Sequence, residues 1–243
     1  MIFMVTSVDS NIYLVFDIDD TMYDLMAPFK KAHDHLFAGR VNADTTELFK
    51  KSRIYSDIIL EREKNGEIPS TDSFHERLRM TYQDVRLKIT REESALFEAE
   101  YRYYQTKIEM FDFMRDVLDY CKEARLPIAV LTNGSYKGQW KKTEALNLQS
   151  WFSPEQIFIS GEIGYHKPDV RAFQAVSERM HFLPEQTWYV GDTYESDIIG
   201  ASQAGWHTIW LNHRMRACPE ENCIADKEIH EGIFLLPLIK TLL

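Results

Sequence analysis

Three aspartates and a threonine directly follow a short apolar run near the N-terminus. The run is residues 13–16 (YLVF), and Asp17, Asp19, Asp20 and Thr21 come next. Short continuous apolar runs are typical of strands buried on both faces of a parallel sheet. Carboxylates this close repel one another, so such a cluster usually holds a cation, shares a proton or is heavily solvated. Because open parallel sheets bind ligands at the carboxyl ends of their strands, the stretch predicts a binding site there.

A block of amphipathic helices follows this first strand. Apolar residues at helical spacing predict helices at residues 28–37, 46–64, 73–89 and 91–108. Thr90 and Glu93 form a capping-box pattern before the last of them, and Asn65 with Gly66 marks a break after the second. The block therefore predicts a small helical bundle with its own core.

After residue 111 the pattern alternates between helix and strand, as in parallel α/β sheets. Strands are predicted at 127–131, 157–159, 188–190 and 208–211, the last closing the sheet, and helices at 113–121, 137–146, 170–180 and 232–243. The fold class is thus α/β. A Rossmann-like parallel sheet core of residues 1–22 and 109–243 carries a helical cap at residues 23–108, and an insertion at that point can act as a lid.

Composition restricts the partners of the chain. Its 243 residues carry a formal net charge of -10, which argues against a nucleic acid polymer or a membrane surface, since both recruit clustered Lys and Arg. The apolar segment 1–8 lacks a basic region and a cleavage site, and no apolar run is long enough to span a membrane. We therefore expect a cytoplasmic protein, a monomer by default.

Cysteine spacing gives little support to a zinc site. Cys121, Cys218 and Cys223 are too few for a disulfide framework. Cys218 and Cys223 with the nearby His213 and His230 match no common structural-zinc spacing. Free thiols are the favoured interpretation.

Polar residues at the other strand ends complete the predicted site. Thr132 and Asp192 follow strands, and Lys167 lies in a loop before a helix. Carboxylates for a divalent cation, a hydroxyl and an ammonium suit the binding and in-line attack of a phosphoryl group. Each residue taken singly has a structural alternative: Thr132 as a strand-end hydroxyl, Lys167 as a solvated lysine, Asp197 as a helix N-cap. Their joint occurrence favours the functional interpretation.

Four segments, in order, resemble the motifs of the haloacid dehalogenase superfamily. They are DIDDT at residues 17–21, LTNG at 131–134, GYHKPD at 164–169 and GDTYESD at 191–197. The helical insertion is similar to the cap of the C1-type members. The resemblance covers nearly the whole chain, except the first dozen residues and the segment 214–226.

The resemblance implies a chemical role for each aspartate of the motifs. Asp17 would be the nucleophile that forms an aspartyl-phosphate, and Asp19 the general acid and then base. Mg²⁺ would be bound by the Asp17 carboxylate, the Asp19 backbone carbonyl and Asp192, with Asp197 supporting this site. Asp20 is interpreted as an extra acid without a catalytic role.

The resemblance also implies a phosphate-binding set and a reaction class. Thr132 and the backbone N–H of Asn133 would hold the phosphoryl group, which Lys167 would neutralise. The dehalogenases lack the carboxylate that stands here as Asp19, so the predicted activity is hydrolysis of a small phosphate ester. The alternatives are a 2-haloacid dehalogenase-type hydrolase, a sugar phosphomutase and a catalytically idle binding protein.

The substrate is the least constrained expectation. Residues 191–200, 204–205 and 210–212 look similar to the nucleotidase-like and flavin-mononucleotide-phosphatase-like branch, which favours a nucleoside monophosphate or FMN. In the cap, Phe29 and His33 lie one helical turn apart, and either could contact the substrate. The favoured interpretation places Phe29 in the cap core and His33 in solvent.

Overall fold

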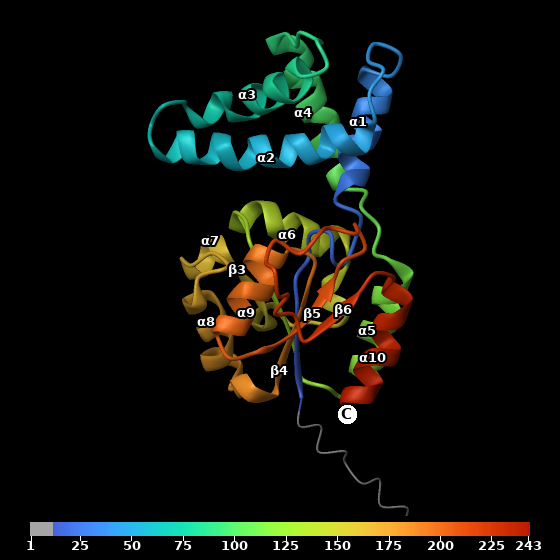
Figure 1. Ribbon diagram of the computed structural model, residues 1–243, viewed down its shortest axis with the longest axis vertical. Coiled ribbons are helices and arrows are strands. Elements are labelled where there is room, and N and C mark those ends of the chain that lie inside the picture. The colour runs from blue at the N-terminus through green and yellow to red at the C-terminus, as the bar shows by residue number, and fades with distance from the viewer. Residues whose placement is uncertain (1–11) are drawn as a thin grey trace, which may run out of the picture. The chain divides into compact units, whose positions relative to one another are not determined.

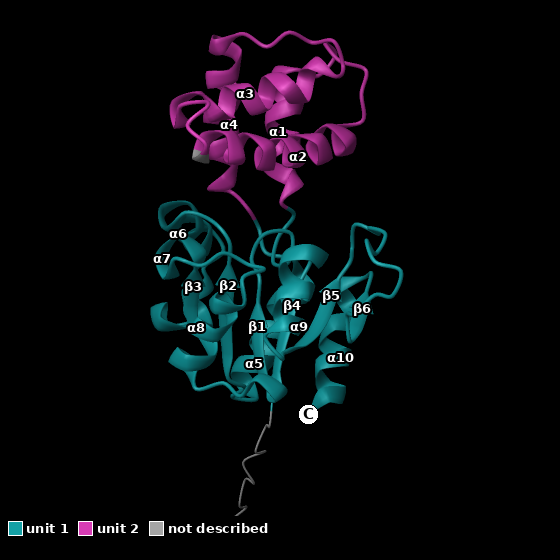
Figure 2. Ribbon diagram, turned by 60° about the vertical axis from the view of Figure 1, so that its left-hand side comes forward, with its two compact units in different colours: residues 1–24, 109–243 teal, residues 25–108 magenta. Residues whose placement is uncertain are grey.

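The computed structural model describes residues 12–243 (Figure 1). The chain forms two compact units (Figure 2). The core unit runs up to Asp24 and resumes at Glu109, and the helical unit is Leu25–Ile108. The segment 1–8, predicted to be neither a signal peptide nor a membrane span, lies outside the described residues. Within the described part of the chain, no helix is both long and apolar enough to cross a membrane.

A six-stranded parallel sheet forms the centre of the core unit, so the predicted α/β fold class is confirmed. The strand order is β3-β2-β1-β4-β5-β6. The chain runs outward from β1 to β3 and then returns to the other side of β1 with β4. Ligand sites in open α/β sheets lie at such a reversal. The strands are β1 (Tyr13–Phe16), β2 (Ile128–Thr132), β3 (Ile157–Ile159), β4 (Thr187–Gly191), β5 (His207–Leu211) and β6 (Lys227–Ile229).

Strand β6 corrects the prediction that residues 208–211 close the sheet. It pairs with β5 in parallel, Trp210 opposite Glu228. The strand has only three residues, and Lys227 and Glu228 are exposed. Short, charged strands are typical of sheet edges and carry no apolar run that would reveal them in a sequence.

Helices cover both faces of the sheet (Figure 1). On one face α8 and α9 bury an apolar cluster that includes Val15, Phe173, Tyr189 and Trp206. On the other, α5 packs against α10. The α-helices of the core unit are α5 (Asp112–Glu123), α6 (Tyr136–Ala145), α7 (Ser160–Ile163), α8 (Val170–Met180), α9 (Ile199–Gln203) and α10 (Leu235–Leu242).

The helical unit has its own aromatic core. Phe29, Phe37, Tyr82 and Phe97 are buried in one cluster. The predicted packing of Phe29 is confirmed, since only 2% of it is exposed. The helices are α1 (Met26–Leu36), α2 (Thr45–Lys64), α3 (Ser70–Gln83) and α4 (Arg91–Gln105).

The capping-box pattern predicted the start of α4 correctly, whereas the apolar spacing placed the end of α3 too late. The capping box before α4 is confirmed by two hydrogen bonds, Thr90 N to Glu93 Oε2 at 2.9 Å and Glu93 N to Thr90 Oγ1 at 3.2 Å. The prediction that α3 extends to residue 89 is wrong. The helix ends at Gln83, and Arg86 adopts a left-handed φ of 61°, which turns the chain out of the helix.

His33 corrects the expectation of a solvated side chain. It is 4% exposed, and its Nδ1 lies 2.7 Å from the hydroxyl oxygen of Tyr82. Burial lowers the pKa of this imidazole. A buried ring with a hydrogen-bond partner in the bundle is a structural histidine.

The three cysteines form no disulfide with one another, as the free-thiol interpretation expected. Cys121 is buried in α5, whereas Cys223 is exposed. Burial raises the pKa of the Cys121 thiol to about 12, so this thiol stays protonated and behaves as a core side chain.

Candidate active site

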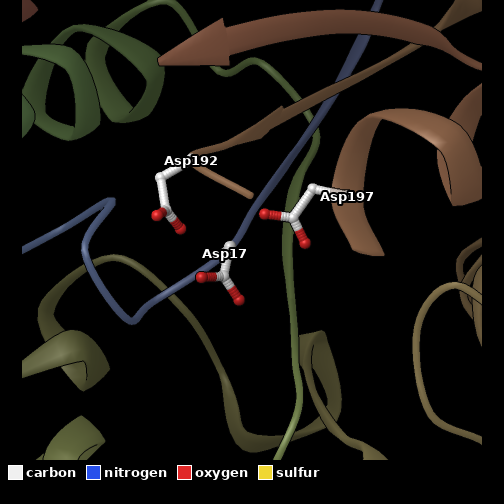
Figure 3. Close-up of side chains that lie close together, drawn as sticks. All are labelled: Asp17, Asp192 and Asp197. Carbon is white, nitrogen blue, oxygen red and sulfur yellow. The ribbon is translucent and has the colours of Figure 1, made fainter. Parts of the chain in front are cut away.

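Three carboxylates meet at the carboxyl ends of β1 and β4 (Figure 3). Asp17 follows β1 and Asp192 follows β4, and the Asp17 N–H donates to the Val190 carbonyl at 2.9 Å. Asp197 comes from the turn of π-helix after Asp192. One carboxylate oxygen of each residue lies within 4.8 Å of the other two, and all three residues are buried. The strand order thus produces the proximity that the sequence predicted for Asp17 and Asp192.

A buried lysine lies beside this acidic cluster. Lys167 Nζ is 2.7 Å from both Asp17 Oδ1 and Asp197 Oδ1, and it donates to the Tyr189 hydroxyl at 2.7 Å. That hydroxyl donates in turn to the Leu131 carbonyl at 2.7 Å. Burial disfavours the ammonium, but the two carboxylates outweigh it and raise the pKa of Lys167 well above its ordinary value. Lys167 is therefore a permanent positive charge, and the alternative of a solvated lysine is wrong.

The Asn133 side chain holds the backbone of Lys167. Asn133 Oδ1 accepts from Lys167 N, and Asn133 Nδ2 donates to the Lys167 carbonyl, each at 2.9 Å. These two hydrogen bonds hold the loop that contains Lys167 at the end of β2. Sequence reasoning considered only the backbone N–H of Asn133, because a hydrogen bond across 34 residues leaves no local pattern.

The acidic cluster has more negative charge than its protein partners neutralise. Burial raises the pKa of Asp17 to about 7, helped by the charges of Asp197 and Asp19 and opposed by Lys167. Burial also raises the pKa of Asp192 well above its ordinary value, with further contributions from Asp197 and Asp20. Buried carboxylate oxygens with excess negative charge are the ligands that hard divalent cations prefer. The residues present therefore fit Mg²⁺.

Arg216 is a second cation at this cluster. Its Nη1 lies 3.0 Å from Asp192 Oδ2 and 3.3 Å from the Asp192 carbonyl oxygen. The Arg216 side chain is 43% exposed, so this ion pair is more weakly held than the buried one of Lys167. Sequence reasoning missed Arg216 because it lies in the segment without a motif.

Asp19 points to a different set of partners. Its carboxylate is 2.7 and 2.6 Å from Lys142 Nζ, and it accepts from the Tyr23 hydroxyl at 2.6 Å and Gln139 Nε2 at 3.1 Å. Burial opposes ionisation, but Lys142 outweighs it and lowers the pKa of Asp19. Asp17 and Asp19, two residues apart, thus have carboxyl groups in opposite electrostatic environments. In the protein without a bound cation, the pKa of Asp17 is raised and that of Asp19 is lowered, and a cation at the acidic cluster would favour the ionised form of Asp17.

Thr132 shares a hydrogen-bond partner with Asp19. It is fully buried at the end of β2, and its hydroxyl oxygen accepts from Gln139 Nε2 at 2.7 Å. The same amide nitrogen is 2.6 Å from the Asn133 carbonyl oxygen. Gln139 therefore ties the end of β2 to Asp19. Neither Gln139 nor Lys142 was recognised in the sequence, where both belong to an ordinary polar helix.

Asp20 anchors the chain that follows β5. Its carboxylate accepts from Arg214 at 2.9 and 2.6 Å, and Arg214 also reaches Asp24 at 2.6 Å. His213 Nε2 lies 2.8 Å from the Asp20 carbonyl oxygen. Asp20 has a left-handed φ of 61° and is 1% exposed. These contacts give it a structural role, holding residues 213–214 against the loop that follows β1.

Comparisons with known proteins place the chain among hydrolases. A family model of haloacid dehalogenase-like hydrolases matches residues 13–205. Glyceraldehyde 3-phosphate phosphatase of Methanopyrus kandleri is 26% identical over 235 residues, covering 94% of this chain and 97% of that protein. The pyrimidine 5'-nucleotidase PynA of Streptococcus pneumoniae is 25% identical over 209 residues, covering 82% of this chain and 83% of that protein.

A solved structure shares the fold along nearly the whole chain. The HAD-hydrolase YfnB of Bacillus subtilis, solved with bound magnesium, superposes with a TM-score of 0.71 at 24% identity. The match covers 94% of this chain and 98% of that chain. At this identity the likeness shows the fold alone.

Proposed function

The chain belongs to the family of haloacid dehalogenase-like hydrolases, and we propose that it hydrolyses the phosphomonoesters of small metabolites, with Mg²⁺ as cofactor and an aspartyl-phosphate on Asp17 as intermediate. One observation carries this proposal. Asp17 lies in a buried acidic cluster against Lys167, whereas Asp19 is held apart from that cluster by its own partners. We assign the attack on phosphorus to the first carboxylate and proton transfer to the second.

The two aspartates divide the reaction into two displacements at phosphorus. The Asp17 carboxylate attacks in line, the bond from phosphorus to the leaving oxygen breaks, and Asp19 gives that oxygen a proton. Asp19 then takes a proton from water, the water oxygen attacks phosphorus, and the bond to Asp17 breaks to release phosphate. Lys167 holds Asp17 in place and offsets the charge of the phosphoryl oxygens.

Mg²⁺ would be held by the carboxylates of Asp17 and Asp192 and by the backbone carbonyl of Asp19. When bound, it supplies positive charge that stabilises the phosphoryl group during transfer. Asp197 supports this site, because it bonds Lys167 and accepts from the Thr193 N–H at 3.0 Å. The Thr132 hydroxyl and the Asn133 N–H complete the phosphate-binding set.

Asp19 favours phosphate ester hydrolysis over the alternatives. Cleavage of a carbon–halogen bond needs no acid to protonate a leaving oxygen, so a dehalogenase has little use for this residue. A phosphomutase would use the same residues but requires that water be excluded. An idle binding protein has no need to keep Asp17 and Lys167 in a buried cluster with a separately held Asp19 two residues away.

The proposed substrates are nucleoside monophosphates or FMN, and their selection by the helical unit stays a prediction, as do the monomeric state and the cytoplasmic location. A relative named as a pyrimidine nucleotidase supports this choice, whereas another is named for a triose phosphate. A panel of phosphorylated metabolites, assayed for phosphate release with Mg²⁺ and with EDTA, tests the proposal. Absence of Mg²⁺-dependent release from every compound would refute it.

Asp19→Asn is expected to slow the chemical steps while leaving Mg²⁺ binding intact. The loss of a general acid and base typically costs about 10²–10⁴-fold in rate. The metal is proposed to use the backbone carbonyl of residue 19, which the substitution keeps. Stopped-flow kinetics and a Mg²⁺ titration separate the two effects. A large fall in Mg²⁺ affinity would contradict the assigned role.

Mg²⁺ is expected to stabilise the fold. A ligand at about 100 times its Kd raises the free energy of unfolding by about 2.7 kcal/mol when it binds only the native state. The melting temperature should therefore rise when Mg²⁺ is added to EDTA-treated protein, and Asp192→Asn should remove most of the rise. Equal melting temperatures with Mg²⁺ and with EDTA would show that the acidic cluster holds no metal.

A further inference from the structure

A second, partly buried ion pair is formed by Asp19 in the loop after β1. Lys142 of α6 contacts both oxygens of Asp19, at 2.7 and 2.6 Å. Its side chain is 14% exposed and that of Asp19 is 24% exposed. A solvated ion pair of this kind would contribute little, but one removed from water holds its partner firmly in place.

Gln139 extends this contact into the predicted phosphate-binding set. It lies one turn before Lys142, so both side chains project from the same face of α6. Its amide nitrogen is within 3.1 Å of Asp19, Thr132 and the Asn133 carbonyl oxygen. Its Oε1 is buried without a hydrogen-bond partner in the described structure. The Gln139 amide nitrogen, with two protons shared among three acceptors, links Asp19 to Thr132 and the end of β2.

We propose that Lys142 is a positioning residue for Asp19 and that it acts on departure of the leaving group. Asp19 lies close enough to Asp17 for their charges to interact. Without Lys142, the Asp19 carboxyl group would be free to turn towards a cation that Asp17 and Asp192 would hold. Lys142 prevents this turn, with Gln139 and Tyr23 fixing the direction in which the carboxyl group points. The proposal rests on the proposed phosphatase function.

The expected signature is a loss that depends on the leaving group. A phenolate or alkoxide needs a proton as it departs, whereas 4-nitrophenolate is stable enough to depart without one. Lys142→Met should therefore lower kcat/KM, which reports the steps up to departure of the leaving group, by about 10²-fold for phenyl phosphate, within the range of general acid catalysis, and by much less for 4-nitrophenyl phosphate. Lys142 also lowers the pKa of Asp19, so its removal makes Asp19 the more easily protonated acid. A fall in kcat/KM therefore reports lost position of the carboxyl group and not lost acidity.

Three further variants separate positioning from a structural role. Lys141→Met removes the exposed neighbouring lysine of α6 and should leave both rates unchanged. Lys142→Arg should restore most of the phenyl phosphate rate, because a guanidinium also pairs with a carboxylate. In an Asp19→Asn background, Lys142→Met should add almost no further loss, since the two residues act together.

The kinetic results distinguish failure of the positioning role of Lys142 from failure of the proposed phosphatase function. Equal loss of kcat/KM for both esters in Lys142→Met, with loss of thermal stability, would overturn the positioning role and leave only a structural one. Full additivity of the two substitutions would overturn it as well. If the wild-type protein hydrolyses neither ester with Mg²⁺, the proposed function fails first, and the inference fails with it.

Discussion

Asp17→Asn is expected to lower kcat/KM for phosphate esters by at least about 10⁴-fold, as is usual when the nucleophile of a covalent mechanism is removed. Asparagine has the shape of aspartate but cannot form an acyl phosphate. Lys167 keeps its bonds to Asp197 and to the Tyr189 hydroxyl, so the surroundings should be preserved. Undiminished turnover in this variant would refute the mechanism.

Thermal stability provides an internal control for this variant. The pKa of Asp17 rises from 3.8 to about 7 in the folded protein because of burial. A carboxyl group whose pKa is higher in the folded state stabilises the fold at pH values below its pKa in the unfolded chain. This contribution is lost as the pH rises through about 7, the pKa in the folded protein. In metal-free protein at pH 8, Asp17→Asn should therefore melt no lower than the wild type. A clear drop in melting temperature would mean that the lost activity reflects misfolding.

Lys167→Met is expected to have the largest effect on stability. The substitution removes the ammonium that bonds Asp17, Asp197 and Tyr189 inside the core unit. Breaking a buried ion pair by removing one partner typically costs about 3–5 kcal/mol, because the other charge is left without compensation. The free energy of unfolding from urea denaturation should fall by this amount, and turnover should be lost as well.

The exposed Lys137 of α6 offers a matched control for this substitution. Lys137→Met should change the free energy of unfolding by no more than about 0.5 kcal/mol, as is usual for surface sites. The cost of Lys167→Met should also shrink in acid, because protonation of Asp17, whose pKa is raised by burial, removes an uncompensated charge. A Lys167→Met protein as stable as the control would contradict the buried ion pair.

The sequence was most informative about the strand ends. Asp17 and Asp192 were expected to meet because neighbouring parallel strands end at the same edge of a sheet, and β1 and β4 are neighbours. The apolar runs of the buried strands were visible because burial on both faces leaves no polar alternation. Strand β6 was missed because its exposed residues carry no such run.

Contacts between distant segments could not be predicted in the same way. Lys142 reaches Asp19 across 123 residues, and Asn133 reaches Lys167 across 34. In the sequence Lys142 is one of two adjacent lysines on a polar helix, and which of them turns inward depends on how α6 packs. Such partners follow from the tertiary fold, which local periodicity does not specify.

The measurement that tests the central claim most directly is the mass of the peptide that contains Asp17 after an acid quench during turnover. The wild-type enzyme, mixed with Mg²⁺ and a phosphate ester that it hydrolyses, should yield this peptide with the added mass of one phosphoryl group on Asp17. The Asp17→Asn variant should yield it unmodified. Active turnover with no phosphoryl group on Asp17, or with the group on another residue, would contradict the proposed mechanism.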